Sequence, residues 1–186
     1  AAVPRSGWPD VIDRHTLAFA GYQEYTRRLA RHWGDPLPDS VVLVAATAGW
    51  IGYMLQQSLE NALRRAGTPR EVVTIITQVQ VREDDPALGR PTKFIGQALS
   101  EERAAELRRE GHAVKTDGRG NLRRVVGSPV PQAIHELKTI KRLLEQGTLV
   151  VACGGGGAPI YDDPLRGWEG IDAVVDKDLV AAVLAR

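Results

Sequence analysis

Apolar residues recur every three or four positions in several segments, the spacing that places them on one face of an α-helix. The first such segment begins at Ala18 and ends at Trp33, and the next begins at Ile51 and ends at Ala66. An apolar run at 41–46 precedes the second segment, and Thr47-Ala48-Gly49 is expected to end that run. The pattern predicts helices at 18–33, 51–66, 134–144 and 179–186, with Pro131 in the first turn of the third and Asp178 capping the last.

Three other segments are apolar without helical spacing and predict strands. Residues 72–81 are rich in β-branched side chains, 148–153 form a short run before four glycines, and 170–175 form a further short run. Strands that alternate with helices of this length are typical of an α/β fold with a parallel sheet. We therefore expect a core of this kind at 44–83 and 130–186, preceded by an N-terminal helical segment at 1–43.

The stretch from Asp84 to Pro129 differs from the rest of the chain in its pattern of apolar, charged and turn-forming residues. It contains a short charged helix capped by Ser100, two turns marked by glycine, and extended segments between them. We interpret it as a small excursion from the main sheet, part hairpin and part loop. Its cations either meet a phosphate or form a solvated basic surface, and composition leaves both open for Lys93, Lys115, Arg119, Arg123 and Arg124.

A run of four glycines, Gly154 to Gly157, follows directly after a predicted strand. Glycine allows backbone dihedrals that are closed to other residues, and it lets main-chain N–H groups approach a ligand closely. No Gly-Lys-Ser/Thr follows, which excludes a P-loop, and the spacing differs from a Rossmann fingerprint. The run predicts an anion site at the carboxyl end of a strand, with the class of anion left open.

Composition and charge narrow the class of protein. The 186 residues include 24 Lys and Arg against 23 Asp and Glu, so no overall charge favours nucleic acid or a membrane surface. The single cysteine, Cys153, excludes an internal disulfide and fits a reducing compartment such as the cytoplasm. The four histidines are scattered, and we expect no metal held directly by the protein.

From Val44 onward the sequence resembles a carbamate kinase, a member of the amino acid kinase family. The likeness is carried by an ordered set of short stretches, among them Pro91-Thr92-Lys93, the glycine run after Cys153, and Asp176-Lys177-Asp178. The full set covers residues 49–55, 76–79, 85–87, 91–96, 117–120, 123–126, 128–129, 153–157 and 175–179. The resemblance implies a three-layer αβα sandwich with a mainly parallel sheet, a homodimer, and residues 84–129 as a protruding subdomain over the active site.

The resemblance also implies an activity, the reversible transfer of a phosphoryl group between ATP and carbamate with Mg²⁺, giving ADP and carbamoyl phosphate. On this view Lys93 and Lys177 are catalytic, and Asp176 and Asp178 lie near the nucleotide or metal. The substrate or phosphate would be bound by Gly154, Gly155, Gly156 and Arg119. Phosphoryl transfer needs positioning and well-placed cations more than covalent chemistry, which two lysines and a glycine-lined site supply. Arginine breakdown, purine breakdown and carbamoyl phosphate synthesis all remain open as pathways.

The sequence also departs from the family pattern. Residues 1–43 contain neither the Gly-Gly-Asn-Ala nor the His-Gly-Asn-Gly-Pro-Gln motif, and the chain ends before the half that holds adenine in the family. Two alternatives therefore stand beside the kinase: a shortened non-catalytic homologue that acts as a binding or assembly subunit, and carbamoyl phosphate chemistry without ATP. A sheet without its outer strands leaves edges that invite pairing, so we expect the chain alone to self-associate.

Overall fold

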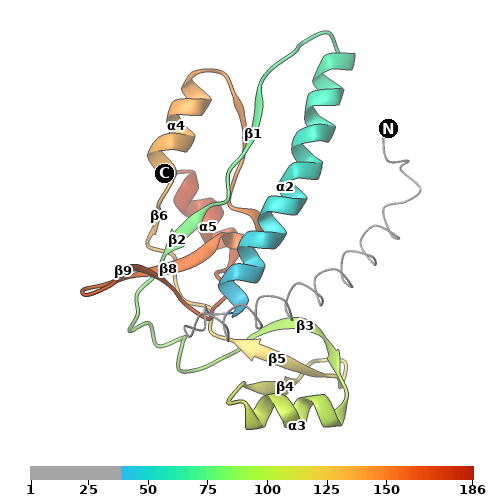
Figure 1. The fold of residues 1–186 in the computed structure, drawn as a ribbon, viewed down its shortest axis with the longest axis vertical. Coiled ribbons are helices and arrows are strands. Elements are labelled where there is room, and N and C mark those ends of the chain that lie inside the picture. Colours follow the sequence, from blue (N-terminus) through green and yellow to red (C-terminus); the bar gives the residue numbers. More distant parts are fainter. Residues whose placement is uncertain (1–38) are drawn as a thin grey trace. The chain divides into compact units, whose positions relative to one another are not determined.

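The computed structural model describes residues 39–186. The chain divides into two compact units, Ala1–Asp39 and Ser40–Arg186, and the description below concerns the second. The predicted helix at 18–33 therefore lies outside the described residues. The described part contains short strands, four α-helices and one 3₁₀ turn (Figure 1).

Helix α2 (Asp39–Arg65) is continuous, so the break predicted at 47–49 is wrong. Thr47 stays in the helix by donating its hydroxyl to the Leu43 carbonyl at 2.7 Å. Gly52 lets the helix backbone approach strand β1 (Val72–Thr74), because a Cβ there would lie 2.1 Å from Thr74 Cγ2. The Thr74 hydroxyl instead donates to the Gly52 carbonyl at 2.9 Å. The glycine thus serves close packing and does not end the helix.

The predicted apolar stripe of α2 does not face the described core. The side of α2 that packs on β1 carries Gly52 and Gln56, whose side-chain oxygen accepts from the Thr74 N–H at 2.9 Å. Ile51, Leu55 and Tyr53 are exposed. Within residues 39–186, this leaves an apolar stripe of α2 on the surface.

Two pairs of parallel strands form the centre of the fold. Strand β1 pairs in parallel with β7 (Leu149–Val151), and β2 (Gln78–Gln80) pairs in parallel with β8 (Ala158–Asp163). The predicted single strand at 72–81 is therefore wrong in one respect, since residues 75–77 interrupt it. The register passes from Thr74 opposite Val151 to Gln78 opposite Ala158, so residues 75–77 face the longer segment 152–157.

Two antiparallel strands extend the β2–β8 pair into a four-stranded sheet, in the order β6-β2-β8-β9. Strand β6 (Ala133–Ile134) occupies the position where we predicted the start of a helix, and α4 begins only at Leu137 (Leu137–Glu145). The cause is the ladder with β2, in which Gln132 N–H donates to the Gln80 carbonyl at 2.8 Å. The strand predicted at 170–175 is wrong in position. The strand in this part of the chain is β9 (Gly167–Gly170), which forms a hairpin with β8.

Helices cover both faces of the central strands (Figure 1). Thr74 and Ile76 lie next to Gly52 and Gly49 of α2, whereas Ile75 packs on the opposite side. There the core contains Val79 and Ile140, together with residues of α5 (Lys177–Leu184). Its buried members are Val79, Val81, Ile134, Ile140, Val175 and Val180. Helices on both faces agree with the αβα layers that the resemblance implies.

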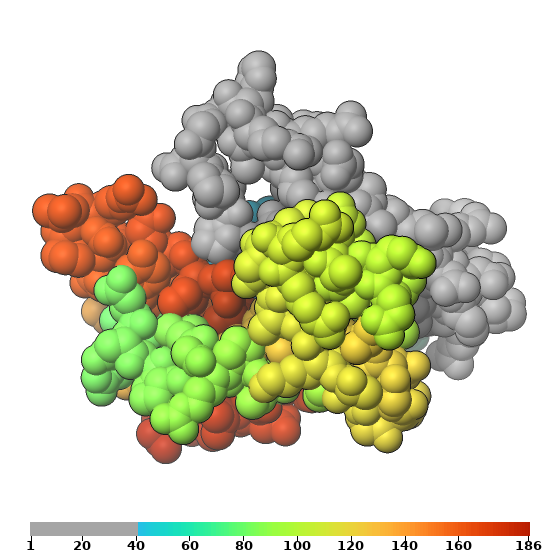
Figure 2. All heavy atoms as spheres, turned by 90° about the horizontal axis from the view of Figure 1, so that it is seen from below, coloured from blue at the N-terminus to red at the C-terminus, as the bar shows by residue number. Residues whose placement is uncertain are grey.

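A separate antiparallel sheet, in the order β3-β5-β4, is formed within residues 84–129. Its strands are β3 (Lys93–Leu99), β4 (Val114–Thr116) and β5 (Leu122–Val126). Helix α3 (Glu101–Arg109) packs on it through buried Ala104 and Leu107. The predicted cap of this helix is confirmed, since the Ser100 hydroxyl accepts from the Arg103 N–H at 3.2 Å. This sheet and helix lie on the face turned toward the viewer in Figure 2.

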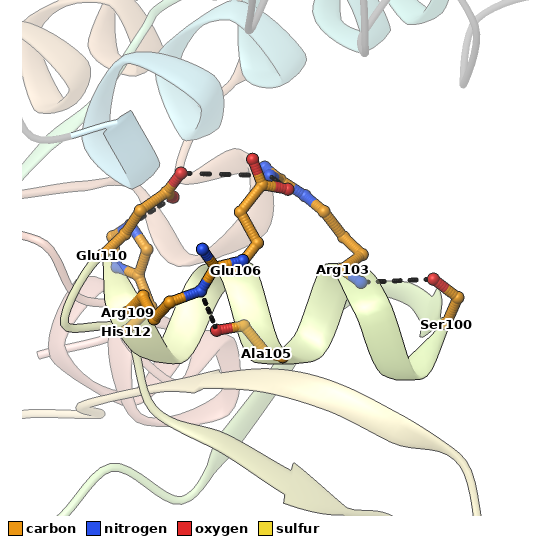
Figure 3. Close-up of polar contacts among 7 residues, drawn as sticks. All are labelled: Ser100, Arg103, Ala105, Glu106, Arg109, Glu110 and His112. Carbon is orange, nitrogen blue, oxygen red and sulfur yellow. Dashed lines mark hydrogen bonds and ion pairs between the residues drawn. The ribbon is translucent and has the colours of Figure 1, made fainter.

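The outer side of α3 carries a chain of charged contacts (Figure 3). The Arg103 guanidinium is hydrogen-bonded to the Glu106 carboxylate and lies 4.0 Å from that of Glu110. Glu110 in turn lies 3.9 Å from the His112 imidazole. These charges are a solvated helix face, in agreement with the acidic first turn and basic last turn of the sequence.

Candidate active site

The glycine loop, residues 153–157, connects β7 to β8 at the carboxyl end of β7. Cys153 has φ 56° and ψ 30°, Gly154–Gly156 form a single 3₁₀ turn, and Gly155, Gly156 and Gly157 all have positive φ. A Cβ on Gly156 would lie 2.5 Å from the Val175 carbonyl oxygen, and one on Gly157 would lie 2.5 Å from Val79 Cγ2. Both conformation and space therefore require glycine at these two positions.

The loop presents two unused backbone donors. Gly156 N–H donates to the Cys153 carbonyl at 3.0 Å and Gly157 N–H to the Gly154 carbonyl at 3.1 Å. Within residues 39–186, the N–H groups of Gly154 and Gly155 have no acceptor. Successive backbone N–H groups in such a turn form a concave site that suits an anion. Helix α2 lies against one side, since a Cβ on Gly154 would be 3.2 Å from Ala48 Cβ.

Lys93 and Asp176 meet beside this loop although they are far apart in the sequence. Lys93 is the first residue of β3, and its Nζ lies 3.1 Å from Asp176 Oδ2, with both side chains partly exposed. The other carboxylate oxygen of Asp176 accepts from the Asp178 N–H at 2.9 Å and caps α5. The Lys93 hydrogen bond, followed by the Asp178 N–H, holds the pKa of Asp176 below its usual value.

Lys177 is placed at the same location by the start of α5. Its backbone nitrogen lies 3.5 Å from the position that a Cβ on Gly156 would occupy, so the helix begins against the glycine loop. Its side chain is exposed. The loop, the cap of α5 and the first residue of β3 thus bring the Lys93 ammonium, the backbone of Lys177 and two backbone donors to one locality. Cationic and N–H groups of this kind suit an anionic substrate.

Comparisons with known proteins agree with this arrangement. No protein-family profile matches the chain. The carbamate kinases of Pyrococcus furiosus and Pyrococcus horikoshii are 47% and 46% identical to it over 156 and 153 residues, 82% of this chain in each case and 49% and 48% of theirs. The carbamate kinase of Staphylococcus epidermidis is 45% identical over 141 residues, 75% of this chain and 46% of its own.

Solved structures give the same result. A protein of Aeropyrum pernix has 39% identity and a TM-score of 0.74, over 81% of this chain and 48% of its own. The carbamate kinase of Giardia lamblia bound to citric acid has 34% identity and a TM-score of 0.73, over 89% of this chain and 53% of its own. The chain matches the carbamate kinases. The predicted resemblance and the α/β fold class are therefore confirmed, and the chain spans about half the length of the curated carbamate kinases it matches.

Two further predicted site residues, Arg119 and Asp178, make no hydrogen bond or ion pair with the glycine loop within residues 39–186. Arg119 is exposed in the turn between β4 and β5, where its N–H donates to Asp117 Oδ1 at 2.9 Å. Its guanidinium has no hydrogen bond or ion pair to another predicted site residue in the described part of the chain. Asp178 follows Lys177, and the cap that we assigned to it is made by Asp176. The roles of all the predicted site residues, Arg119 and Asp178 among them, stay predictions.

Sequence reasoning missed one buried polar residue, Thr77. Its side chain is 1% exposed, and its hydroxyl accepts from the Cys153 N–H at 2.9 Å. A threonine inside a β-branched run is common in strands, so nothing in its type marked it. Thr77 lies within the stretch 76–79 that carries part of the family resemblance, but its contact with Cys153 depends on the interruption of the strand at 75–77, which the pattern of apolar residues does not reveal.

The described residues contain no group of three or more His, Cys, Asp or Glu side chains that could hold a metal ion. Asp176, the carboxylate nearest the glycine loop among the predicted site residues, is already paired with Lys93. Mg²⁺ commonly binds through one or two carboxylates and substrate phosphates, so these residues do not fit a metal held by side chains alone. None of the helices at 39–186 has both the length and the apolar character needed to span a membrane.

Proposed function

We propose that this chain forms the anion-binding part of a carbamate kinase, which transfers a phosphoryl group between carbamoyl phosphate and ADP. The observation that supports the proposal is that the Lys93–Asp176 pair and the start of α5, which carries Lys177, lie against the glycine loop, whose Gly154 and Gly155 N–H groups have no acceptor within residues 39–186. The match to carbamate kinases over 82% of the chain supports carbamoyl phosphate as the anion. AMP-PNP in the Giardia lamblia relative, which is 34% identical with a TM-score of 0.71, over 85% of this chain and 50% of its own, supports ATP or ADP as the nucleotide.

In this reaction the bond between phosphorus and the carbamoyl oxygen breaks, and a bond from the β-phosphate oxygen of ADP to the same phosphorus forms. Carbamate leaves as an anion, and no oxidant or added proton is needed. We assign the N–H groups of Gly154 and Gly155, with the Lys177 ammonium, to the phosphoryl oxygens, over which negative charge spreads in the transition state. Mg²⁺ would enter with the nucleotide phosphates and neutralise part of their charge.

Lys93 has a different role in the proposal. Its partner Asp176 holds the ammonium in a partly exposed position beside the glycine loop. A bound carbamate or carbamoyl phosphate offers a second negative group within reach of the same ammonium, so Lys93 can contact the substrate without leaving its carboxylate partner. Residues 84–129, which carry Lys93, would in this way act as the subdomain over the active site.

Assembly and location are also proposed from the resemblance. The exposed stripe of α2, with Ile51, Leu55 and Leu59, offers apolar surface for a homodimer or for the remainder of a longer chain. Self-association of this chain on size-exclusion chromatography is expected, and a monodisperse monomer that melts cooperatively would contradict it. We expect a cytoplasmic location because the single cysteine fits a reducing compartment.

The test is ATP formation from carbamoyl phosphate and Mg²⁺-ADP, run together with calorimetric titration of carbamoyl phosphate alone. We expect Lys93→Ala and Lys177→Ala each to lower the rate at least about 100-fold, as removal of transition-state donors does elsewhere. The matched control is Lys138→Ala, which removes an exposed lysine of α4. Equal rates in all three variants would contradict the proposal. Binding of carbamoyl phosphate without ATP formation would favour the ATP-independent alternative.

A further inference from the structure

Thr77 contacts both ends of the glycine loop from a buried position. Its hydroxyl accepts from the Cys153 N–H at 2.9 Å, where the loop begins. Its carbonyl accepts from the Ala158 N–H at 2.8 Å, where the loop ends. Only 1% of the residue is exposed, so water does not compete for these contacts. Thr77 therefore connects the two ends of the loop across the interruption of the parallel strands.

The start of the loop is held in an unfavourable conformation. Cys153, with φ 56°, is the only non-glycine residue with positive φ within residues 39–186. Such a backbone places the Cβ close to its own carbonyl, and it persists where neighbouring groups hold it. Two hydrogen bonds do so here: the Cys153 N–H to the Thr77 hydroxyl, and the Gly156 N–H to the Cys153 carbonyl at 3.0 Å.

The direction of the Thr77 hydroxyl is also fixed. It donates to the Ile75 carbonyl at 3.2 Å, so its lone pairs remain for the Cys153 N–H. Without the hydroxyl, the Cys153 N–H would lose its acceptor and the residue could return to an ordinary φ. Since the dihedrals of Cys153 orient the next peptide group, that change would turn the Gly154 N–H away from its present direction.

We infer that Thr77 is a positioning residue whose hydroxyl holds Cys153 in the left-handed conformation that aims the Gly154 and Gly155 N–H groups at the bound anion. The inference rests on the proposed function for the identity of that anion. The loop geometry on which the role of Thr77 depends is the same whichever anion binds. The role of Thr77 and the proposed function can therefore be tested separately.

The experiment compares Thr77→Val with Thr148→Val. Both threonines are buried, and both replacements keep the side-chain shape while removing a hydrogen-bonded hydroxyl. Thr148 donates to Glu71 Oε2 at 3.1 Å at the other end of β7, away from the loop. The two measurements are calorimetric affinity for carbamoyl phosphate and the rate at which iodoacetamide alkylates Cys153, the only cysteine. All variants are compared at a temperature where circular dichroism shows them folded.

We expect Thr77→Val to weaken carbamoyl phosphate binding about tenfold, the loss typical of one unmade hydrogen bond. Burial raises the pKa of the Cys153 thiol and the Thr77 hydroxyl lowers it, so alkylation is measured at a pH high enough to ionise the thiol in every variant. Under that condition Thr77→Val should speed alkylation of Cys153 because the loop relaxes. Thr77→Ser, which keeps the hydroxyl, should restore both values, and Thr148→Val should change neither. If Thr77→Val behaves as wild type in both measurements, the inference is wrong.

A second variant separates positioning from loss of stability. Glycine adopts positive φ without strain, so Cys153→Gly added to Thr77→Val should recover most of the lost affinity. A double variant that binds no better than Thr77→Val contradicts the inference. If the wild-type chain does not bind carbamoyl phosphate, the proposed function fails. The alkylation rates of Thr77→Val and Thr148→Val then still decide the role of Thr77.

Discussion

The glycine loop and the segment that carries Lys93 lie on two sides of the candidate site, and different interactions hold them. The loop is fixed by backbone hydrogen bonds, the Thr77 hydroxyl, and contacts so close that Gly156 and Gly157 admit no Cβ. The segment at 84–129 is joined to the core by two ion pairs, Lys93–Asp176 at 3.1 Å and Arg124–Asp172 at 2.7 Å. A short backbone bridge also links them at Gly127, whose carbonyl accepts from the Val174 N–H at 3.1 Å.

This difference predicts how each side responds to change. Steric contacts and buried hydrogen bonds are insensitive to salt and to mild changes of pH, whereas partly exposed ion pairs are weakened by both. The loop should therefore behave as a rigid anion cradle. The lysine side should adjust its position when a charged substrate arrives.

The largest effect is expected at the loop. Gly156→Ala should lower the free energy of unfolding by about 3 kcal/mol or more and abolish carbamoyl phosphate binding. The reason is that its Cβ would lie 2.5 Å from the Val175 carbonyl, at φ 97°. Urea denaturation provides the measurement. Gly118→Ala is the control, because no atom lies within 4 Å of its Cβ, and similar losses in the two variants would refute a rigid loop.

A smaller effect is expected at the ion pair that joins Arg124 of β5 to Asp172, which follows β9. Asp172→Asn should cost about 1 kcal/mol, because the Arg124 side chain is only 13% exposed and would lose its carboxylate. The comparison variant is Asp84→Asn, which breaks the fully exposed pair with Arg82 and should leave the urea midpoint unchanged. Equal sensitivity of the two variants would show that the Arg124 contact contributes nothing to holding the segment at 84–129.

The smallest and most condition-dependent effect concerns Asp176. Lys93 and the Asp178 N–H lower the pKa of Asp176, so its charged form stabilises the fold above its unfolded pKa of about 3.9. This stability is lost as the pH falls through the lower, folded-state pKa. Asp176→Asn keeps a capping oxygen but removes the charge. The difference in urea midpoint between wild type and variant should be constant from pH 5 to pH 8, begin to shrink at about pH 4, and vanish only below the folded-state pKa. A difference that grows on acidification would have the wrong sign.

Much of the fold could be predicted because its patterns are local. The α3 cap at Ser100, the α5 helix and the strand before the glycines follow from residue type and spacing. The errors have tertiary causes. The break expected at 47–49 is absent because α2 runs on to pack against β1, where Thr74 occupies the space that a side chain on Gly52 would need. Ile134 fits a helical stripe, yet the ladder with β2 places it in a strand.

The candidate site likewise has a part that could be predicted from local motifs and a part that depends on tertiary contacts. The glycine run and the two lysines could be identified from motifs. That Asp176 both caps α5 and pairs with Lys93 depends on a contact between residues 83 positions apart, which no local pattern encodes. Thr77 escaped prediction for a similar reason, since its role depends on the backbone of Cys153 on a neighbouring segment.

The most direct test of the anion cradle is a titration of ¹⁵N-labelled chain with carbamoyl phosphate, followed by the amide resonances of Gly154 and Gly155. We predict that these two resonances shift most and saturate together, and that the resonances of Gly118 and Gly111, which lie outside the site, do not move. Shifts confined to residues away from the glycine loop, or saturation without any change at Gly154 and Gly155, would contradict it.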